Sequence, residues 1–148
     1  MIRTELDVGD LPSILAMGYT FHQESRYKDL NYDPNKIEKL LLASLNHPDK
    51  IFFAYDSSFN GLILLQMGTQ FFSDDKWAGD QAFYVTPNKR GTRLALELLE
   101  LGAKWAKENG AKELVILHNA GLGLESAEKF YTKHGFGLSG LIFNKQVN

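Results

Sequence analysis

The sequence contains no cysteine among its 148 residues. This absence excludes disulfide bonds, thiolate metal sites and cysteine nucleophiles. The chain also lacks any apolar run near the ~20 residues that a membrane-spanning helix needs, and residues 1–7 lack the apolar stretch of a signal peptide. We therefore expect a cytoplasmic protein that does not interact with a membrane.

The chain has little excess of either charge, because 16 basic residues are balanced by 18 acidic ones and the formal net charge is -2. This balance gives no broad electrostatic attraction to nucleic acid or to an anionic membrane. The sequence contains no internal repeat and no Pro-, Gly- or Ser-rich linker. A chain of this length buries enough surface to fold unaided, so we expect a single domain over residues 1–148.

The spacing of apolar residues predicts helices mixed with strands. Asp10 before Pro12 and Asp33 before Pro34 are typical helix starts, and Asn60-Gly61 is typical of a hairpin turn. The mixture predicts an α+β fold (mixed α/β) around a mixed sheet. The predicted elements, in chain order, are strand 2–6, helix 11–22, a helix after Pro34, strands 51–55, 62–67 and 81–85, helix 91–108, strand 114–117, helix 124–134 and strand 138–144.

A strand, a basic turn and a helix start follow one another around residue 90. Lys89, Arg90 and Arg93 lie where the first amides of the long helix lack internal partners. The helix dipole is positive at this end, so the turn is suited to a phosphate or pyrophosphate. No P-loop or dinucleotide glycine pattern is present, which argues against ATP and NAD. The alternative is a surface turn whose basic residues are simply solvated.

The last predicted helix carries Ala127 and Tyr131, which lie four residues apart on one face. A tyrosine beside a small residue can point into an interior groove and act as a general acid. The alternative is an ordinary core tyrosine with a satisfied hydroxyl group.

Together the two segments resemble the GNAT acetyltransferase superfamily, over residues 81–143 and in the order of the preceding elements. The resemblance implies the GNAT fold, a mixed central sheet of about six to seven strands flanked by about four helices. Two of its parallel strands splay apart to hold CoA. The motif residues are Val85, Pro87, Arg90, Gly91 and Ala95, then Ala127, Phe130, Tyr131, Lys133, Gly135 and Phe136.

The resemblance implies an N-acetyltransferase that moves an acetyl group from acetyl-CoA to a primary amine of a small molecule or peptide, without a metal. In the family, the residue matching Tyr131 is often the general acid that protonates the departing thiolate. Backbone amides of the loop 90–95 hold the pyrophosphate, and the preceding strand pairs with the pantetheine arm. The implied cofactor-binding residues are Phe83, Tyr84, Val85, Arg90, Gly91, Thr92, Arg93, Leu94 and Ala95.

Three departures from the family pattern stand out. Arg93 replaces a loop glycine, and we expect its side chain to swing outward rather than crowd the phosphates. Leu124 replaces a frequent asparagine, whose role Asn119 could cover. The strand positions that share a face with Val85 carry no carboxylate, and Asp80 should point to the other face unless a bulge resets the register. The general base is left open among His22, Glu24, Asp80 and His118, and some acceptors need no dedicated base.

The acceptor site of the family lies opposite the CoA and is walled by the first helical region. This placement points to His22, Glu24, Arg26 and Tyr27 on one side and to Phe71-Phe72 on the other. The aromatic content permits a homodimer. The alternative function is a catalytically inactive GNAT-fold module that binds CoA or a partner.

Overall fold

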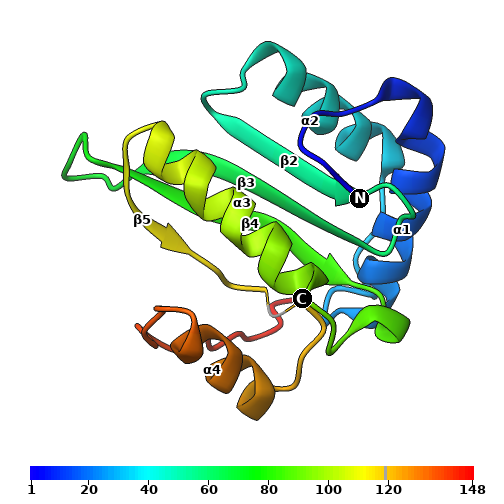
Figure 1. The fold of residues 1–148 in the computed structure, drawn as a ribbon. Coiled ribbons are helices and arrows are strands. Elements are labelled where there is room, and N and C mark those ends of the chain that lie inside the picture. The colour runs from blue at the N-terminus through cyan, green and yellow to red at the C-terminus, as the bar shows by residue number, and fades with distance from the viewer. Residues whose placement is uncertain (119) are drawn as a thin grey trace.

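The structure is a computed structural model that describes residues 1–118 and 120–148. A five-stranded sheet in the order β1-β2-β3-β4-β5 forms its centre (Figure 1). All neighbouring strands are antiparallel except β4 and β5, which are parallel. The strands are β1 (Ile2–Arg3), β2 (Ile51–Asp56), β3 (Gly61–Thr69), β4 (Lys76–Val85) and β5 (Ala111–Val115).

Within the described residues, four α-helices and two short 3-10 helices accompany the sheet. Helix α3 crosses one face of the sheet, in front in Figure 1, and α1 and α2 cover the other face. The helices are α1 (Leu11–Glu24), α2 (Pro34–Asn46), α3 (Leu94–Glu108) and α4 (Leu124–Lys133), with 3-10 turns η1 (Val8–Asp10) and η2 (Pro87–Lys89).

Each face of the sheet has its own apolar core, because side chains alternate between the faces of a strand. On the α3 side, Ile63, Phe83 and Val85 pack with Leu98 and other residues of that helix. On the opposite side, Tyr55 and Tyr84 belong to the cluster that α1 and α2 cover. Strand β4 therefore contributes to both cores.

A bulge in β4 changes which residues share a face. Ala82 lies opposite Leu64, but Asp80 lies opposite the next residue, Leu65, so Gln81 is the extra residue. In a regular strand, Ala78 and Phe83 would lie on opposite faces. Because of the bulge, both belong to the α3-side cluster. The exception that the sequence left open therefore applies, because the bulge turns Asp80 away from the face expected of a regular strand.

The mixed α+β fold is confirmed, but several details of its elements differ from the expectation. Helix α3 begins at Leu94 and not at residue 91, because Gly91 has a φ of 84°, which a right-handed helix does not allow. The first strand is limited to Ile2–Arg3. In the β2–β3 turn, Phe59 adopts the positive φ of 60°, not Asn60 or Gly61.

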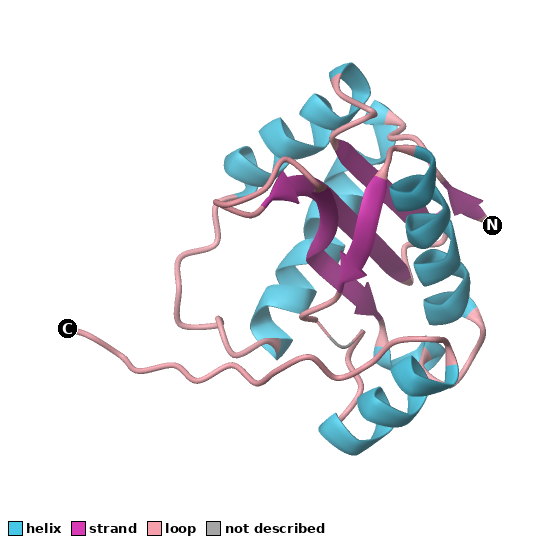
Figure 2. Cartoon of the chain, turned by 90° about the vertical axis from the view of Figure 1, so that its left-hand side faces the viewer, coloured by secondary structure: helices cyan, strands magenta, loops and turns pink. Residues whose placement is uncertain are grey.

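The predicted strand 138–144 does not form, so the described sheet has five strands rather than six to seven. Two glycines, Gly137 and Gly140, interrupt the apolar pattern and weaken its strand propensity. The segment after α4 extends away from the body of the protein (Figure 2). Within the described residues, no helix is long and apolar enough to cross a membrane.

Candidate active site

Strands β4 and β5 separate at one end of the sheet. They pair only from Lys76 to Gly79 on β4 and from Ala111 to Val115 on β5. Strand β4 then continues to Val85, while β5 has already ended. The opening between them, called the splay below, is therefore flanked by a strand edge that has no neighbouring strand among the described residues.

The free edge of β4 presents backbone groups to the splay. The Thr86 amide donates to the Asn60 carbonyl at 2.8 Å, which places these two residues in a hydrogen-bonded pair across β3 and β4. Hydrogen-bonded and non-hydrogen-bonded pairs alternate along antiparallel strands. The backbone groups of Phe83 and Val85 therefore point away from β3 and toward the splay, where an extended ligand arm could pair with them.

The side chain of Arg90 lies across this opening. Its Nε donates to the Val85 carbonyl at 3.0 Å, and its guanidinium pairs with the Glu24 carboxylate of α1 at 3.3 Å. Gly121 lies against the same guanidinium, and a side chain at that position would require the guanidinium to move. An extended ligand arm bound along β4 must replace Arg90 as the hydrogen-bond donor to the Val85 carbonyl.

The turn between β4 and α3 has the features of an anion site. The amides of Gly91, Arg93, Ala95 and Leu96 have no hydrogen-bond partner within the described part of the chain. The first amides of a helix attract negative charge. Nothing lies within 4 Å of the position that a Cβ of Gly91 would take. The loop thus fits a pyrophosphate, with the splay beside it for the attached arm.

Arg93 points away from these amides. Its side chain is 74% exposed and lies 3.8 Å from Glu97, one turn along α3. The outward orientation expected of Arg93 is what the structure shows, so the side chain leaves the loop open.

Tyr131 approaches the splay from α4. Its hydroxyl donates to the His118 carbonyl at 2.9 Å, and its ring packs against the α3-side cluster. Burial raises the pKa of Tyr131, and the negative charge of Asp80 raises it further. A hydroxyl with a raised pKa stays protonated at neutral pH, which is the form that a general acid needs.

Asp80 and His118 form a hydrogen-bonded pair at the same place. The Asp80 carboxylate accepts the Leu117 amide at 2.7 Å, the His118 amide at 2.9 Å and the ring Nδ1 of His118 at 2.7 Å. These bonds tie the chain after β5 to β4 and explain why β5 ends before the predicted residue 117. The sequence named both residues only as separate candidates, because the bulge that turns Asp80 toward His118 has no sequence signal.

A groove of about 620 Å³ opens on the α1 side of the splay. Glu24, Arg26 and Tyr27, which the sequence placed in the acceptor site, lie in its wall, whereas His22 does not. The ring of His22 contacts Tyr32 instead. The full lining is Phe21, Glu24, Ser25, Arg26, Tyr27, Tyr84, Arg90, Leu117, His118, Gly121, Leu122 and Ile142.

A family model described as "Acetyltransferase (GNAT) family" matches residues 14–136. The chain belongs to this family. Its class is therefore that of the acyl-CoA-dependent N-acetyltransferases. No curated protein matches the sequence.

Solved structures share the GNAT fold at low sequence identity. An integron cassette protein from the mobile metagenome of Cole Harbour Salt Marsh has a TM-score of 0.73 at 21% identity, covering 99% of this chain and 89% of that one. Glucosamine-6-phosphate N-acetyltransferase from Arabidopsis thaliana has 0.72 at 15%, covering 100% and 98%. Ribosomal-protein-alanine N-acetyltransferase from Brucella melitensis has 0.67 at 17%, covering 99% of both. These likenesses establish the fold and leave the acceptor open.

Two expected features of the GNAT site lie elsewhere or outside the described residues. Phe71 and Phe72 are exposed in the β3–β4 turn, at the opposite end of β4 from Val85, so they cannot wall the acceptor groove. Asn119 falls outside the described residues. Among the residues that are described, no group of three or more His, Asp or Glu side chains is placed to hold a metal ion.

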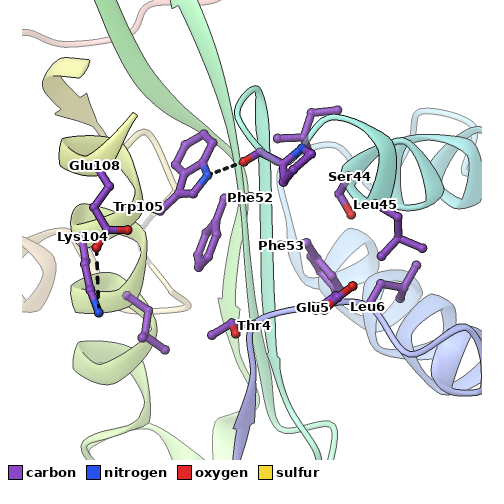
Figure 3. A pocket seen from close by; sticks show the side chains of 13 residues that line it. Thr4, Glu5, Leu6, Ser44, Leu45, Phe52, Phe53, Lys104, Trp105 and Glu108 are labelled. Carbon is purple, nitrogen blue, oxygen red and sulfur yellow. Dashed lines mark hydrogen bonds and ion pairs between the residues drawn. The ribbon is translucent and has the colours of Figure 1, made fainter. Parts of the chain in front are cut away.

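A second groove of about 520 Å³ lies near the other edge of the sheet (Figure 3). Two pairs of its polar groups bond to each other: the Trp105 Nε1 donates to the Pro48 carbonyl at 2.7 Å, and Lys104 pairs with Glu108 at 3.9 Å. No group of the GNAT site lines this groove.

Tyr84 makes the stability of the protein sensitive to alkaline pH. It is 1% exposed, and its buried hydroxyl has no hydrogen-bond partner in the described part of the chain. Burial raises its pKa from 10.0 to about 12; the Glu24 carboxylate adds to the rise and Arg90 opposes it.

We expect the free energy of unfolding to fall as the pH rises from about 10 toward about 12. In that window the unfolded state loses the Tyr84 proton while the folded state keeps it, so the unfolded state is favoured. Urea denaturation of the wild type and Tyr84→Phe at about pH 8 and about pH 11 measures this contribution. Phenylalanine should remove part of the alkaline loss, and an equal loss in both proteins would contradict the assignment.

Proposed function

We propose that this protein transfers an acetyl group from acetyl-CoA to a primary amine that enters through the groove beside α1. The observation that carries the proposal is the junction of β4 and α3. There, the outward-facing backbone of Phe83 and Val85 leads directly to the amides of Gly91, Arg93 and Ala95, which have no hydrogen-bond partner among the described residues. This junction offers hydrogen bonds to an extended arm and an anion site for the phosphates at its end.

Different residues of β4 and of the loop after it bind different parts of CoA. The Gly91, Arg93, Ala95 and Leu96 amides bind the pyrophosphate, and Lys89 and Arg93 add positive charge at the exposed surface. Phe83 and Val85 hold the arm through the strand backbone, whereas the backbone of Tyr84 between them pairs with β3. The Thr92 hydroxyl accepts the amide of Leu94, the first residue of α3, at 3.3 Å, and Arg90 closes the opening from α1 to β4.

The chemistry requires one proton to be delivered inside the splay. Bound acetyl-CoA supplies an acetyl thioester, whose sulfur must leave as a thiol. Tyr131 is the proposed proton donor, because its hydroxyl is protonated at neutral pH and lies beside His118 at the end of the splay. Glu24 in the groove wall gives the amine acceptor a negative partner.

The test has two stages. Acetyl-CoA at ~100 times its dissociation constant should raise the free energy of unfolding by about 2.7 kcal/mol, which is several degrees in Tm for a domain of this size. A panel of primary amines is then screened for release of the CoA thiol. Because the protein has no cysteine, thiol reagents report this release without a background from the protein.

Two glycine variants separate CoA binding from general destabilisation. Gly91 and Gly110 both have a φ of 84° and open space around the Cβ position. Alanine at either position should cost about 1–2 kcal/mol of stability. Only Gly91→Ala, in the proposed phosphate loop, should also weaken acetyl-CoA binding, by about tenfold or more (~1.4 kcal/mol).

The outcomes distinguish the candidate functions. Stabilisation by acetyl-CoA together with thiol release supports the proposal. Stabilisation without turnover across the panel would favour a CoA-binding module. No stabilisation at millimolar acetyl-CoA would overturn both.

A further inference from the structure

We propose that His118 is the general base of the acetyl transfer and that Asp80 positions its ring. The inference rests on the proposed function, which it extends by naming the group that receives the proton of the amine. Four candidates were left open by the sequence, and the structure separates them by geometry.

Asp80 cannot itself reach the amine. Its side chain is 0% exposed, and its two oxygens already accept three hydrogen bonds from Leu117 and His118. An ionised carboxylate is the best acceptor for two backbone amides. The 2.7 Å contact between the Asp80 carboxylate and the Nδ1 of His118 therefore requires a hydrogen on that nitrogen.

His118 is left with a proton-accepting atom on the groove side. Because Nδ1 carries the hydrogen, Nε2 of the neutral ring has a free lone pair. The side chain is 24% exposed, and the residue lines the groove on the side of α1. Its ring meets the edge of Phe21 at 5.7 Å between centroids, which limits its rotation from that side.

The other two candidates are less suited to the role. Glu24 pairs with Arg90 at 3.3 Å, so its carboxylate is already engaged by a cation. His22 is absent from the groove wall, and its Nε2 is buried without a partner among the described residues.

The base and the acid lie on opposite sides of the splay. The His118 ring contacts Phe21, which belongs to the cluster under α1, whereas the Tyr131 ring packs in the α3-side cluster. The amine nitrogen forms its bond to the acetyl carbon as the carbon–sulfur bond breaks. The proton of the nitrogen moves to Nε2 of His118, and the sulfur takes a proton from the Tyr131 hydroxyl.

Several charged and titratable groups face His118 and will shape its pH profile. They are Asp80 from β4, Glu24 at the end of α1, Arg26 and Tyr27 after α1, Tyr84 at the end of β4, Arg90 after η2, and Tyr131 from α4.

The first readout is the tautomer of the ring and requires no turnover. Nitrogen-15 NMR of the labelled wild type should show the neutral His118 ring protonated at Nδ1. In Asp80→Asn, which lacks the carboxylate, this preference should weaken. A wild-type ring protonated at Nε2 would overturn the inference, because the groove-side nitrogen could then accept no proton.

The second readout is the pH dependence of kcat/KM for the best amine of the panel. His118→Gln preserves size but cannot accept a proton, and it should lower kcat about 100-fold or more while acetyl-CoA still stabilises the fold. The part of the kcat/KM–pH profile that arises from a group of the enzyme, and not from the amine, should also disappear. His47→Gln, at the end of α2, is the matched control and should behave as the wild type.

The two hypotheses fail in different ways. If the wild type turns over and His118→Gln stays within about threefold of it, the base assignment is wrong while the acetyltransferase function stands. If the wild type neither binds acetyl-CoA nor releases thiol, both are wrong.

Discussion

Tyr131→Phe should lower kcat for amine acetylation about 100-fold, which is the usual contribution of a general acid. The substitution removes the hydroxyl that is proposed to protonate the leaving sulfur and keeps the ring that packs beside Phe130 and Phe136. Because the hydroxyl acts in the chemical step, kcat and kcat/KM should fall together while the affinity for acetyl-CoA is retained. Steady-state thiol release and a thermal titration measure the two quantities.

Loss of fold would not explain such a result. The substitution removes one hydrogen bond, from the Tyr131 hydroxyl to the His118 carbonyl, worth about 1 kcal/mol. Tyr19→Phe, a half-exposed tyrosine of α1, is the control for the chemical change itself and should retain full activity. A kcat within about threefold of the wild type would show that another group, or water, protonates the sulfur.

Leu98→Ala should lower the free energy of unfolding by about 3 kcal/mol, since removing a fully buried leucine typically costs 2–5 kcal/mol. Leu98 is 0% exposed and belongs to the α3-side cluster with Ile63 and Val85. One turn along the helix, Gly102 has no side chain and lies close to Leu65, so the helix cannot move inward to fill a cavity. Urea denaturation measures the loss.

Glu100→Ala, on the exposed face of the same helix, is the control for helix propensity and should change stability by less than about 0.5 kcal/mol. A loss below about 1 kcal/mol for Leu98→Ala would mean that the core around α3 relaxes into the cavity. The predicted loss also bears on the site, because α3 carries the proposed phosphate loop at its N-terminus.

The sequence was informative where local chemistry determines structure. The helical spacing in α3, the Asp33-Pro34 helix start and the glycine-containing turn after Val85 predicted elements that the structure contains. The motif resemblance also identified the family correctly. These features depend on neighbouring residues, which a single sequence displays directly.

The parts that could not be predicted depend on contacts between distant residues. The bulge at Gln81 sets the face of Asp80, yet it is visible only in the register of β4 against β3. The pairing of Asp80 with His118 joins residues 38 positions apart. The absent strand 138–144 is an exception with a local cause, because Gly137 and Gly140 weaken the strand propensity of its apolar pattern.

The position of Arg90 across the splay has a consequence for ligand affinity. If the arm of CoA binds only when Arg90 has left the Val85 carbonyl, the apparent dissociation constant equals the intrinsic one divided by the fraction of molecules in that open state. The Arg90–Glu24 pair is partly exposed, with side-chain exposures of 26% and 37%, so salt weakens it and enlarges that fraction. Salt also screens the attraction between the loop and the phosphates. Salt therefore affects the affinity for acetyl-CoA in two opposite ways: it favours the open state and it weakens the attraction to the phosphates. The affinity should thus fall less steeply with salt than expected from the charge of the ligand alone.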